Sequence, residues 1–166
     1  MYRPPASRRG WTWIGDGRLA IGAKPGPDDI GRLADDGVTH IVNCRAREQH
    51  LISQDLWMEQ RALGEGRVVA APMWDHGRPQ DPRRWAPAAE FAAAALADPG
   101  ARVLVHCQQG RRRSAMVAYA VLRLGGVSES EAARTILEGR PVTSIVPAYR
   151  ASVEGWLSAR DTPTLQ

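Results

Sequence analysis

The residue types best suited to chemistry lie in the segment 106–114, which reads HCQQGRRRS. Five residues separate Cys107 from Arg113, and an apolar run at 103–105 precedes the segment. A strand that ends in a glycine-containing loop and opens a helix directs backbone N–H groups and the positive helix end at one point, which favours an anion. The same surroundings favour the thiolate form of a cysteine, and the thiolate is the nucleophile. The spacing therefore predicts a phosphate-binding loop (P-loop) that holds a nucleophile, with the planar guanidinium of Arg113 binding two phosphate oxygens.

This segment resembles the signature loop of the cysteine-dependent protein tyrosine and dual-specificity phosphatases, which reads His, Cys, five residues, Arg, and then Ser or Thr. The resemblance implies that Cys107 is the nucleophile that becomes a phosphocysteine. It implies that Arg113 binds the phosphate and stabilises the transition state, and that Ser114 helps the thiolate to leave in the second step. His106 would order the loop and lower the pKa of the cysteine. No metal ion or other cofactor is expected for this chemistry.

The amides of the loop are expected to surround the substrate phosphate. The expected phosphate-binding residues are Gln108, Gln109, Gly110, Arg111, Arg112 and Arg113. Arg112 departs from the dual-specificity pattern, in which a small residue, often serine, is usual. The departure bears on the substrate rather than on the chemistry, because additional phosphate groups could meet Arg111 and Arg112. The two side chains could equally point to solvent.

Attack on a phosphate monoester also requires an acid that protonates the leaving oxygen, and we expect this acid on a separate, mobile loop. Asp75 is the candidate, because it lies in the segment 72–82, which contains proline and glycine and follows the strand-like run 68–71. The resemblance implies an acid at about this place. Asp81 is the alternative, but it precedes a proline and two arginines and is more typical of the N-cap of the next helix.

The order of strands and helices predicts an α/β fold with a mainly parallel central sheet and helices on both faces. The resemblance implies the protein tyrosine phosphatase fold. The predicted strands are 11–14 and 19–22, which form a hairpin around the turn 15–17, then 38–43, 67–71 and 103–105. The predicted helices are 27–36, 48–63, 84–97, 114–124, one from about 128 and one from about 147. Cys107 then follows the carboxyl end of a strand, where such folds bind ligands.

The length of 166 residues and the hydrophobic content of 43% predict one phosphatase domain over residues 1–166. Its core is expected over about 11–157, with frayed ends at 1–9 and 161–166. The resemblance to small dual-specificity phosphatases covers this same core. It includes Arg140, as the basic residue that commonly follows the pair of helices after the loop.

The basic charge of the chain does not indicate a nucleic-acid partner. The net charge is +4, but the basic residues are scattered, nearly all are arginine, and Lys24 is the only lysine. No basic stripe is interleaved with aromatic residues, as single-strand binders require. The first residues lack the apolar core of about 7–15 residues of a secretory signal, and no apolar run reaches the roughly 18 residues that span a bilayer. We therefore expect a cytoplasmic monomer without integral membrane contact.

The chain has only two cysteines, whose spacing matches neither a disulfide framework nor a zinc site. Cys44 ends the predicted strand 38–43, and the sequence NCRARE is somewhat similar to a segment of the tensin-type lipid phosphatases. In those enzymes a cysteine at a similar strand end pairs with the nucleophile under oxidation. The resemblance raises the hypothesis of a reversible disulfide between Cys44 and Cys107 that protects the nucleophile. A buried structural cysteine is the more common alternative.

The sequence thus predicts a cysteine-based phosphomonoester hydrolase. No aromatic recognition loop like that of specialised tyrosine phosphatases is found, so we expect a shallow site that accepts phosphotyrosine and also phosphoserine or phosphothreonine proteins. A phosphoinositide or inositol polyphosphate is the alternative substrate. A catalytically inactive module that binds phosphorylated partners is a third interpretation, disfavoured because Cys107, Arg113 and Ser114 are all present.

Overall fold

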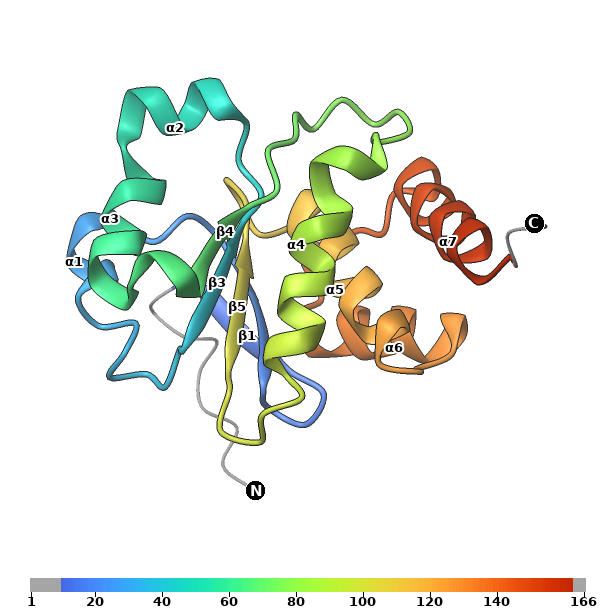
Figure 1. The fold of residues 1–166 in the computed structure, drawn as a ribbon, viewed down its shortest axis with the longest axis horizontal. Coiled ribbons are helices and arrows are strands. Elements are labelled where there is room, and N and C mark those ends of the chain that lie inside the picture. The colour runs from blue at the N-terminus through green and yellow to red at the C-terminus, as the bar shows by residue number, and fades with distance from the viewer. Residues whose placement is uncertain (1–9, 163–166) are drawn as a thin grey trace.

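The computed structural model describes residues 10–162 and shows a sheet of five strands between two layers of helices (Figure 1). The strands are β1 (Trp11–Ile14), β2 (Leu19–Gly22), β3 (His40–Asn43), β4 (Val68–Ala70) and β5 (Val103–His106). The helices are α1 (Pro27–Ile30), α2 (Arg47–Ser53), α3 (Asp55–Leu63), the 3-10 turn η1 (Glu65–Arg67), α4 (Pro82–Ala95), α5 (Arg113–Leu124), α6 (Glu129–Gly139) and α7 (Pro147–Asp161). Of the frayed ends predicted at 1–9 and 161–166, residues 1–9 and 163–166 lie outside the described residues, and Asp161 is the last residue of α7.

The sheet has the order β1-β2-β5-β3-β4. Strands β2, β5, β3 and β4 pair in parallel, and β1 pairs with β2 in antiparallel orientation. The predicted α/β class with a mainly parallel sheet is therefore confirmed, and the hairpin makes the sheet mixed. Its turn closes as predicted, with the N–H of Gly17 donating to the carbonyl of Ile14 at 3.0 Å. Strand β5 lies at the centre of the sheet, so Cys107, which follows this strand, lies midway along the edge at which the parallel strands end.

Helices cover both faces of the sheet, as predicted. Helices α1, α2 and α3 lie on one side and α4 to α7 on the other (Figure 1). Strand β5 shows how the sequence produces two cores, because alternate side chains of a strand point to opposite faces. Val103 and Val105 pack with residues of α4 and α5, whereas Leu104 packs in a separate cluster with Leu33 and Val68. All four β5 side chains, including His106, are fully buried.

Two predicted helices are shorter than the sequence indicated. The helix predicted at 27–36 ends at Ile30, and turns follow through Gly37, which has a φ of 90°. The helix predicted at 48–63 is divided into α2 and α3 by Gln54, whose backbone is left-handed at φ 54°. The break places the Asp55 side chain in the interior, where Asn43 and Ser53 donate hydrogen bonds to it. A buried polar contact thus outweighs helix continuity there.

The remaining element ends agree with the sequence within a few residues. Helix α4 begins at Pro82, because the Asp81 carboxylate caps it by accepting a hydrogen bond from the N–H of Arg83 at 3.0 Å. The Ser128 hydroxyl caps α6 in the same way, accepting from the N–H of Glu131 at 3.3 Å. None of the helices within residues 10–162 is long and apolar enough to cross a membrane.

Candidate active site

The predicted phosphate-binding loop leaves β5 and returns into α5, and its path requires glycine at position 110. Gly110 has a φ of 65°, a left-handed conformation that side chains rarely adopt. A Cβ atom there would lie 2.4 Å from the carbonyl carbon of Gly22 and 2.6 Å from the nitrogen of Ala23. The loop therefore rests directly on the backbone at the end of β2.

Several carbonyl groups of the loop are bonded outside it. The Arg140 guanidinium donates to the carbonyl of Gly110 at 2.8 Å and also to the Thr12 hydroxyl at 2.9 Å. The N–H of Ser144 donates to the carbonyl of Arg111 at 2.8 Å, and the N–H of Lys24 to that of Gln108 at 3.2 Å. Carbonyls held in this way let the N–H groups of a loop converge on an anion. Arg140, the basic residue that the resemblance included, thus supports the loop through its hydrogen bond to Gly110.

Cys107 lies at the floor of this loop, with 3% of its surface exposed. Its Sγ atom is 3.2 Å from the Oγ atom of Ser114. Burial alone would raise the pKa of the thiol. Hydrogen bonds from the Ser114 hydroxyl and from the backbone of Ser114 and Arg111, together with the Arg113 charge, instead lower the pKa of Cys107 to about 7. A large share of the sulfur is therefore thiolate at neutral pH, as a nucleophile requires.

His106 is held by a buried ion pair behind the loop. Its Nε2 atom lies 2.7 Å from Oε2 of Glu59, and both side chains are fully buried. Its Nδ1 atom lies 3.3 Å from the carbonyl oxygen of Cys107. Burial would lower the pKa of His106, but the Glu59 carboxylate raises it above its ordinary value. Since both ring nitrogens face acceptors, the imidazolium form satisfies both contacts and fixes the Cys107 carbonyl.

A chain of polar contacts extends from Glu59 to the rim of the loop. Asn43 donates to Oε1 of Glu59 at 2.7 Å and to Asp55 at 2.9 Å. Arg45 forms an ion pair with Asp55 at 2.8 Å and donates to the Gln108 side chain at 2.9 Å. Burial would raise the pKa of Asp55, but hydrogen bonds led by those from His50 and Asn43 hold it well below its usual range. These contacts link the loop to β3 and α3.

Arg113 is the first residue of α5 and is 5% exposed. Its NH1 group donates to Oε1 of Gln49 at 3.0 Å and to the carbonyl of Met73 at 2.7 Å. Gln49 lies on α2, and Met73 precedes the predicted acid. The guanidinium is thus oriented by two separate segments, which leaves its other nitrogens to meet phosphate oxygens.

The two candidate acids have different surroundings. The Tyr149 hydroxyl donates to Oδ1 of Asp75 at 2.6 Å, and Nε of Arg112 lies 3.2 Å from the same oxygen. Asp81 instead caps α4 and pairs with Arg83 at 2.8 Å on the surface. Asp75 lines the same cavity as Cys107, and Asp81 does not. The arrangement favours Asp75 over Asp81, in agreement with the N-cap interpretation of the latter.

The cavity above Cys107 has a volume of about 310 Å³. Its walls come from the loop, from α2 and from the segment 72–82. The lining residues are Gln49, Trp74, Asp75, Cys107, Gln108, Gln109, Arg111, Arg112 and Arg113. Arg111 and Arg112 therefore border the cavity rather than point wholly into solvent, although the Arg112 side chain is 41% exposed.

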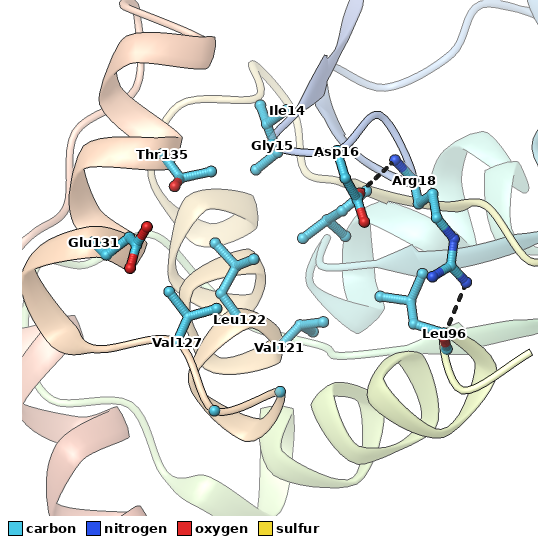
Figure 2. A pocket seen from close by; sticks show the side chains of 13 residues that line it. Ile14, Gly15, Asp16, Arg18, Leu96, Val121, Leu122, Val127, Glu131 and Thr135 are labelled. Carbon is cyan, nitrogen blue, oxygen red and sulfur yellow. Dashed lines mark hydrogen bonds between the residues drawn. The ribbon is translucent and has the colours of Figure 1, made fainter. Parts of the chain in front are cut away.

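A larger cavity of about 550 Å³ lies at the other end of α5 (Figure 2). Figure 2 shows that Ile14 and the α5 residues Val121 and Leu122 line this cavity. Glu131 and Thr135 of α6 line another side of the cavity. No cysteine or histidine lines it. Cys107 and Asp75, the predicted nucleophile and acid, both line the smaller cavity instead.

Cys44 directly follows β3, the strand next to the one that leads to Cys107. Asn43 pairs in register with His106, and the N–H of Cys44 donates to the carbonyl of His106 at 2.8 Å. Both cysteines are buried and free. Burial, followed by the charge of Cys107, raises the pKa of Cys44 well above its ordinary value. Its placement is compatible with either a redox partner or a structural core residue, so the disulfide stays a prediction.

Several residues that contact the predicted site residues did not stand out in the sequence. Gln49, Glu59 and Arg45 contact the predicted site residues from positions far from 106–114 in the chain. Tyr149 lies in the helix predicted from about 147, and its hydroxyl donates to Asp75. The N-cap of α2 is Ala46, which has no polar side chain to mark the helix start, and its N–H donates to the Gln49 side chain at 2.9 Å. Within residues 10–162, no group of three or more His, Cys, Asp or Glu side chains could hold a metal ion.

No protein-family model matches the chain, and no curated protein matches it significantly. Solved structures do match it. PTPMT1 in complex with PI(5)P has a TM-score of 0.74 at 22% identity, covering 90% of this chain and 99% of that one. Human DUSP28 has a TM-score of 0.71 at 22% identity, covering 97% and 98%.

A further match is the human tyrosine phosphatase-like serine/threonine/tyrosine-interacting protein, with a TM-score of 0.73 at 19% identity, covering 93% of this chain and 100% of that one. These matches extend over nearly the full length of both chains, so they compare complete folds rather than a shared loop. The resemblance noted in the sequence is thus confirmed in three dimensions. This chain has the fold of the small dual-specificity and cysteine-based tyrosine phosphatases.

Proposed function

We propose that this protein is a cysteine-dependent phosphomonoester hydrolase that acts on phosphotyrosine, phosphoserine and phosphothreonine in proteins. One observation carries the proposal. The Cys107 thiol, with a pKa lowered to about 7, shares a cavity with Arg113 and with the Asp75 carboxyl group. A nucleophile, an anion-binding guanidinium and an acid are the groups that phosphate-ester cleavage needs.

In the first step, the substrate phosphate binds to the amides of the loop 108–113 and to the Arg113 guanidinium. The Cys107 thiolate attacks phosphorus, and the bond from phosphorus to the leaving oxygen breaks. Asp75 gives its proton to that oxygen, so the product leaves as a neutral alcohol or phenol. The phosphate remains on sulfur as a phosphocysteine.

In the second step, water attacks the phosphocysteine and gives a proton to Asp75, now a carboxylate. The bond between phosphorus and sulfur breaks, and inorganic phosphate forms. The Ser114 hydroxyl, 3.2 Å from the sulfur, donates a hydrogen bond to the departing thiolate. His106 contributes through the backbone, because its ring holds the Cys107 carbonyl and is itself held by Glu59.

A phosphoinositide or inositol polyphosphate is the second candidate substrate. Arg111 and Arg112 both line the catalytic cavity, where a further phosphate group would meet them. One of the structural neighbours, PTPMT1, was crystallised with PI(5)P. The two arginines are the feature of this chain that favours such a substrate, and their replacement tests it.

Hydrolysis of p-nitrophenyl phosphate is the first test, with vanadate as inhibitor and a chelator as control. We expect activity that vanadate blocks and the chelator leaves unchanged, and complete loss in Cys107→Ser with phosphate binding largely kept. Phosphate binding without turnover in the unmodified protein would instead identify a phospho-binding module. A panel of phosphopeptides, phosphoinositides and inositol phosphates, repeated with Arg112→Ser, then separates the protein from the lipid substrate.

The proposal includes the setting in which the enzyme works. A thiolate nucleophile must stay reduced, which supports action in a reducing compartment such as the cytoplasm. One catalytic domain over residues 1–166, acting as a monomer without a metal ion, remains the prediction for the whole chain.

A further inference from the structure

The carboxyl group of Asp75 is held from two sides, by a buried tyrosine and by an arginine of the phosphate-binding loop. Tyr149 lies in the first turn of α7 and is fully buried. Its hydroxyl donates to Oδ1 of Asp75 at 2.6 Å. The same hydroxyl accepts a hydrogen bond from the N–H of Gly77 at 3.0 Å. A single phenol thus joins the C-terminal helix to both ends of the short segment 75–77.

Arg112 provides the second contact. Its Nε atom lies 3.2 Å from Oδ1 of Asp75, and its guanidinium carbon lies 6.0 Å from the centre of the Tyr149 ring. Gly77 has a φ of 75°, and a Cβ atom there would lie 3.3 Å from NH2 of Arg112. The arginine therefore packs closely against the turn that follows the acid. The Tyr149 hydroxyl thus contributes the hydrogen bond to Oδ1, and the Arg112 guanidinium contributes an ion pair to the same oxygen.

The rest of the segment 72–82 is also held by hydrogen bonds. NH1 of Arg113 donates to the carbonyl of Met73 at 2.7 Å. The Gln80 side chain donates to the carbonyl of Trp74 at 2.6 Å, and its backbone N–H donates to the Ser152 hydroxyl of α7 at 3.1 Å. The sequence suggested a mobile lid, but these contacts hold the segment against α5 and α7. An acid held in place before substrate arrives needs no closure step to reach its working position.

We infer that Tyr149 is a positioning residue that presets Asp75 for proton transfer, so that the C-terminal helix α7 takes part in catalysis. The inference rests on the proposed function and deepens it. Tyr149 does not contact the reacting atoms, and it acts through the orientation of the acid. Burial and then the hydrogen bond to Asp75 raise the pKa of Tyr149, so its hydroxyl remains a donor across the working pH range.

The test compares substrates that differ in their need for an acid. A poor leaving group, as in phenyl phosphate, depends on proton donation more than p-nitrophenolate does. The value of kcat/KM reports the first step, in which Asp75 acts as an acid. We expect Tyr149→Phe to lower kcat/KM by about tenfold for phenyl phosphate and by less than about threefold for p-nitrophenyl phosphate. A merely structural tyrosine would lower both values equally.

Tyr119→Phe is the matched control. Tyr119 is the other fully buried tyrosine of α5–α7, and its hydroxyl donates to Glu154 rather than to the acid. We expect it to change thermal stability to a similar extent and to leave the ratio between the two substrates as in the unmodified protein. Equal ratios in Tyr149→Phe and Tyr119→Phe would overturn the inference.

The background variant Asp75→Asn separates the inference from the proposed function. With no acid to position, Tyr149→Phe should cause no further loss when added to Asp75→Asn. Full activity in Asp75→Asn would refute Asp75 as the acid, and absence of phosphatase activity in the unmodified protein would refute the function. If Asp75→Asn is impaired while Tyr149→Phe keeps the original ratio, only the positioning role fails.

Discussion

Removing the Ser114 hydroxyl should change the reactivity of Cys107 in a calculable way. The pKa of Cys107 falls from the ordinary value of 9.0 to about 7, despite burial that acts in the opposite direction. Two units correspond to about 2.7 kcal/mol in favour of the thiolate. The Ser114 side chain is the largest of the contributions that lower this pKa. A hydrogen bond to a charged group contributes about 1.5–3 kcal/mol, so Ser114→Ala should raise the pKa by at least about one unit.

The assay is alkylation by iodoacetamide as a function of pH, with the modified cysteine identified by mass spectrometry. At pH 7 the thiolate fraction should fall from about one half to about one tenth, so alkylation should slow by about fivefold. Cys44 should not interfere, because burial raises its pKa well above the ordinary value.

Ser144→Ala is the matched control for this titration. Ser144 is exposed and contacts the loop only through its backbone N–H, which donates to the carbonyl of Arg111. Its replacement should leave the pKa of Cys107 unchanged. An unmodified protein that titrates at the ordinary thiol value, or a Ser114→Ala variant that titrates like the unmodified protein, would refute the account of how this cysteine is activated.

Three further outcomes are expected. Asp75→Asn should lower kcat by about 10²–10⁴, the usual contribution of a general acid, whereas Asp81→Asn should leave kcat unchanged and lower only the stability of its helix; the reverse result would exchange the two assignments. Glu59→Gln breaks the buried ion pair with the histidine before Cys107 and should lower the free energy of unfolding by about 3–5 kcal/mol. Because His106 has a raised pKa in the folded protein, the ion pair stabilises the fold fully below the ordinary pKa of about 6.5, and this stabilisation is lost as the pH rises through the folded pKa. Denaturant titrations should therefore show that the difference in free energy of unfolding between the unmodified protein and Glu59→Gln becomes smaller at high pH. A difference that does not change with pH contradicts the pairing. Under peroxide, Cys44→Ser should make Cys107 overoxidise faster, and equal rates in mass spectra of the two proteins would remove the disulfide hypothesis.

The path of the loop between β5 and α5 was predictable because its determinants are contiguous in the chain. The apolar residues of β5, the glycine at 110 and the helix start at 113 follow one another, and each has a strong local preference. The hairpin and the parallel strands were predictable for the same reason. Asp81 could also be assigned to a helix cap from its neighbours alone.

The supports of the loop were not predictable in this way, because they come from distant segments. Nothing near Gln49 or Tyr149 in the sequence indicates that one will bind Arg113 and the other Asp75. The division of the helix at Gln54 depends on the burial of Asp55, which is defined only once β3 is in place. Long-range polar contacts overrode local helix preference there.

The contact between Gly110 and the end of β2 ties the loop after β5 to the hairpin of β1 and β2. A Cβ atom on Gly22 would in turn lie 2.6 Å from the Cβ atom of Trp11, so β1 approaches β2 closely at the same point at which the loop rests on β2. Anyone who grafted 106–114 onto another scaffold would therefore have to transplant this hairpin as well. The segment 106–114 would keep its conformation only together with the end of β2 at Gly22, which lies more than eighty positions earlier in the chain.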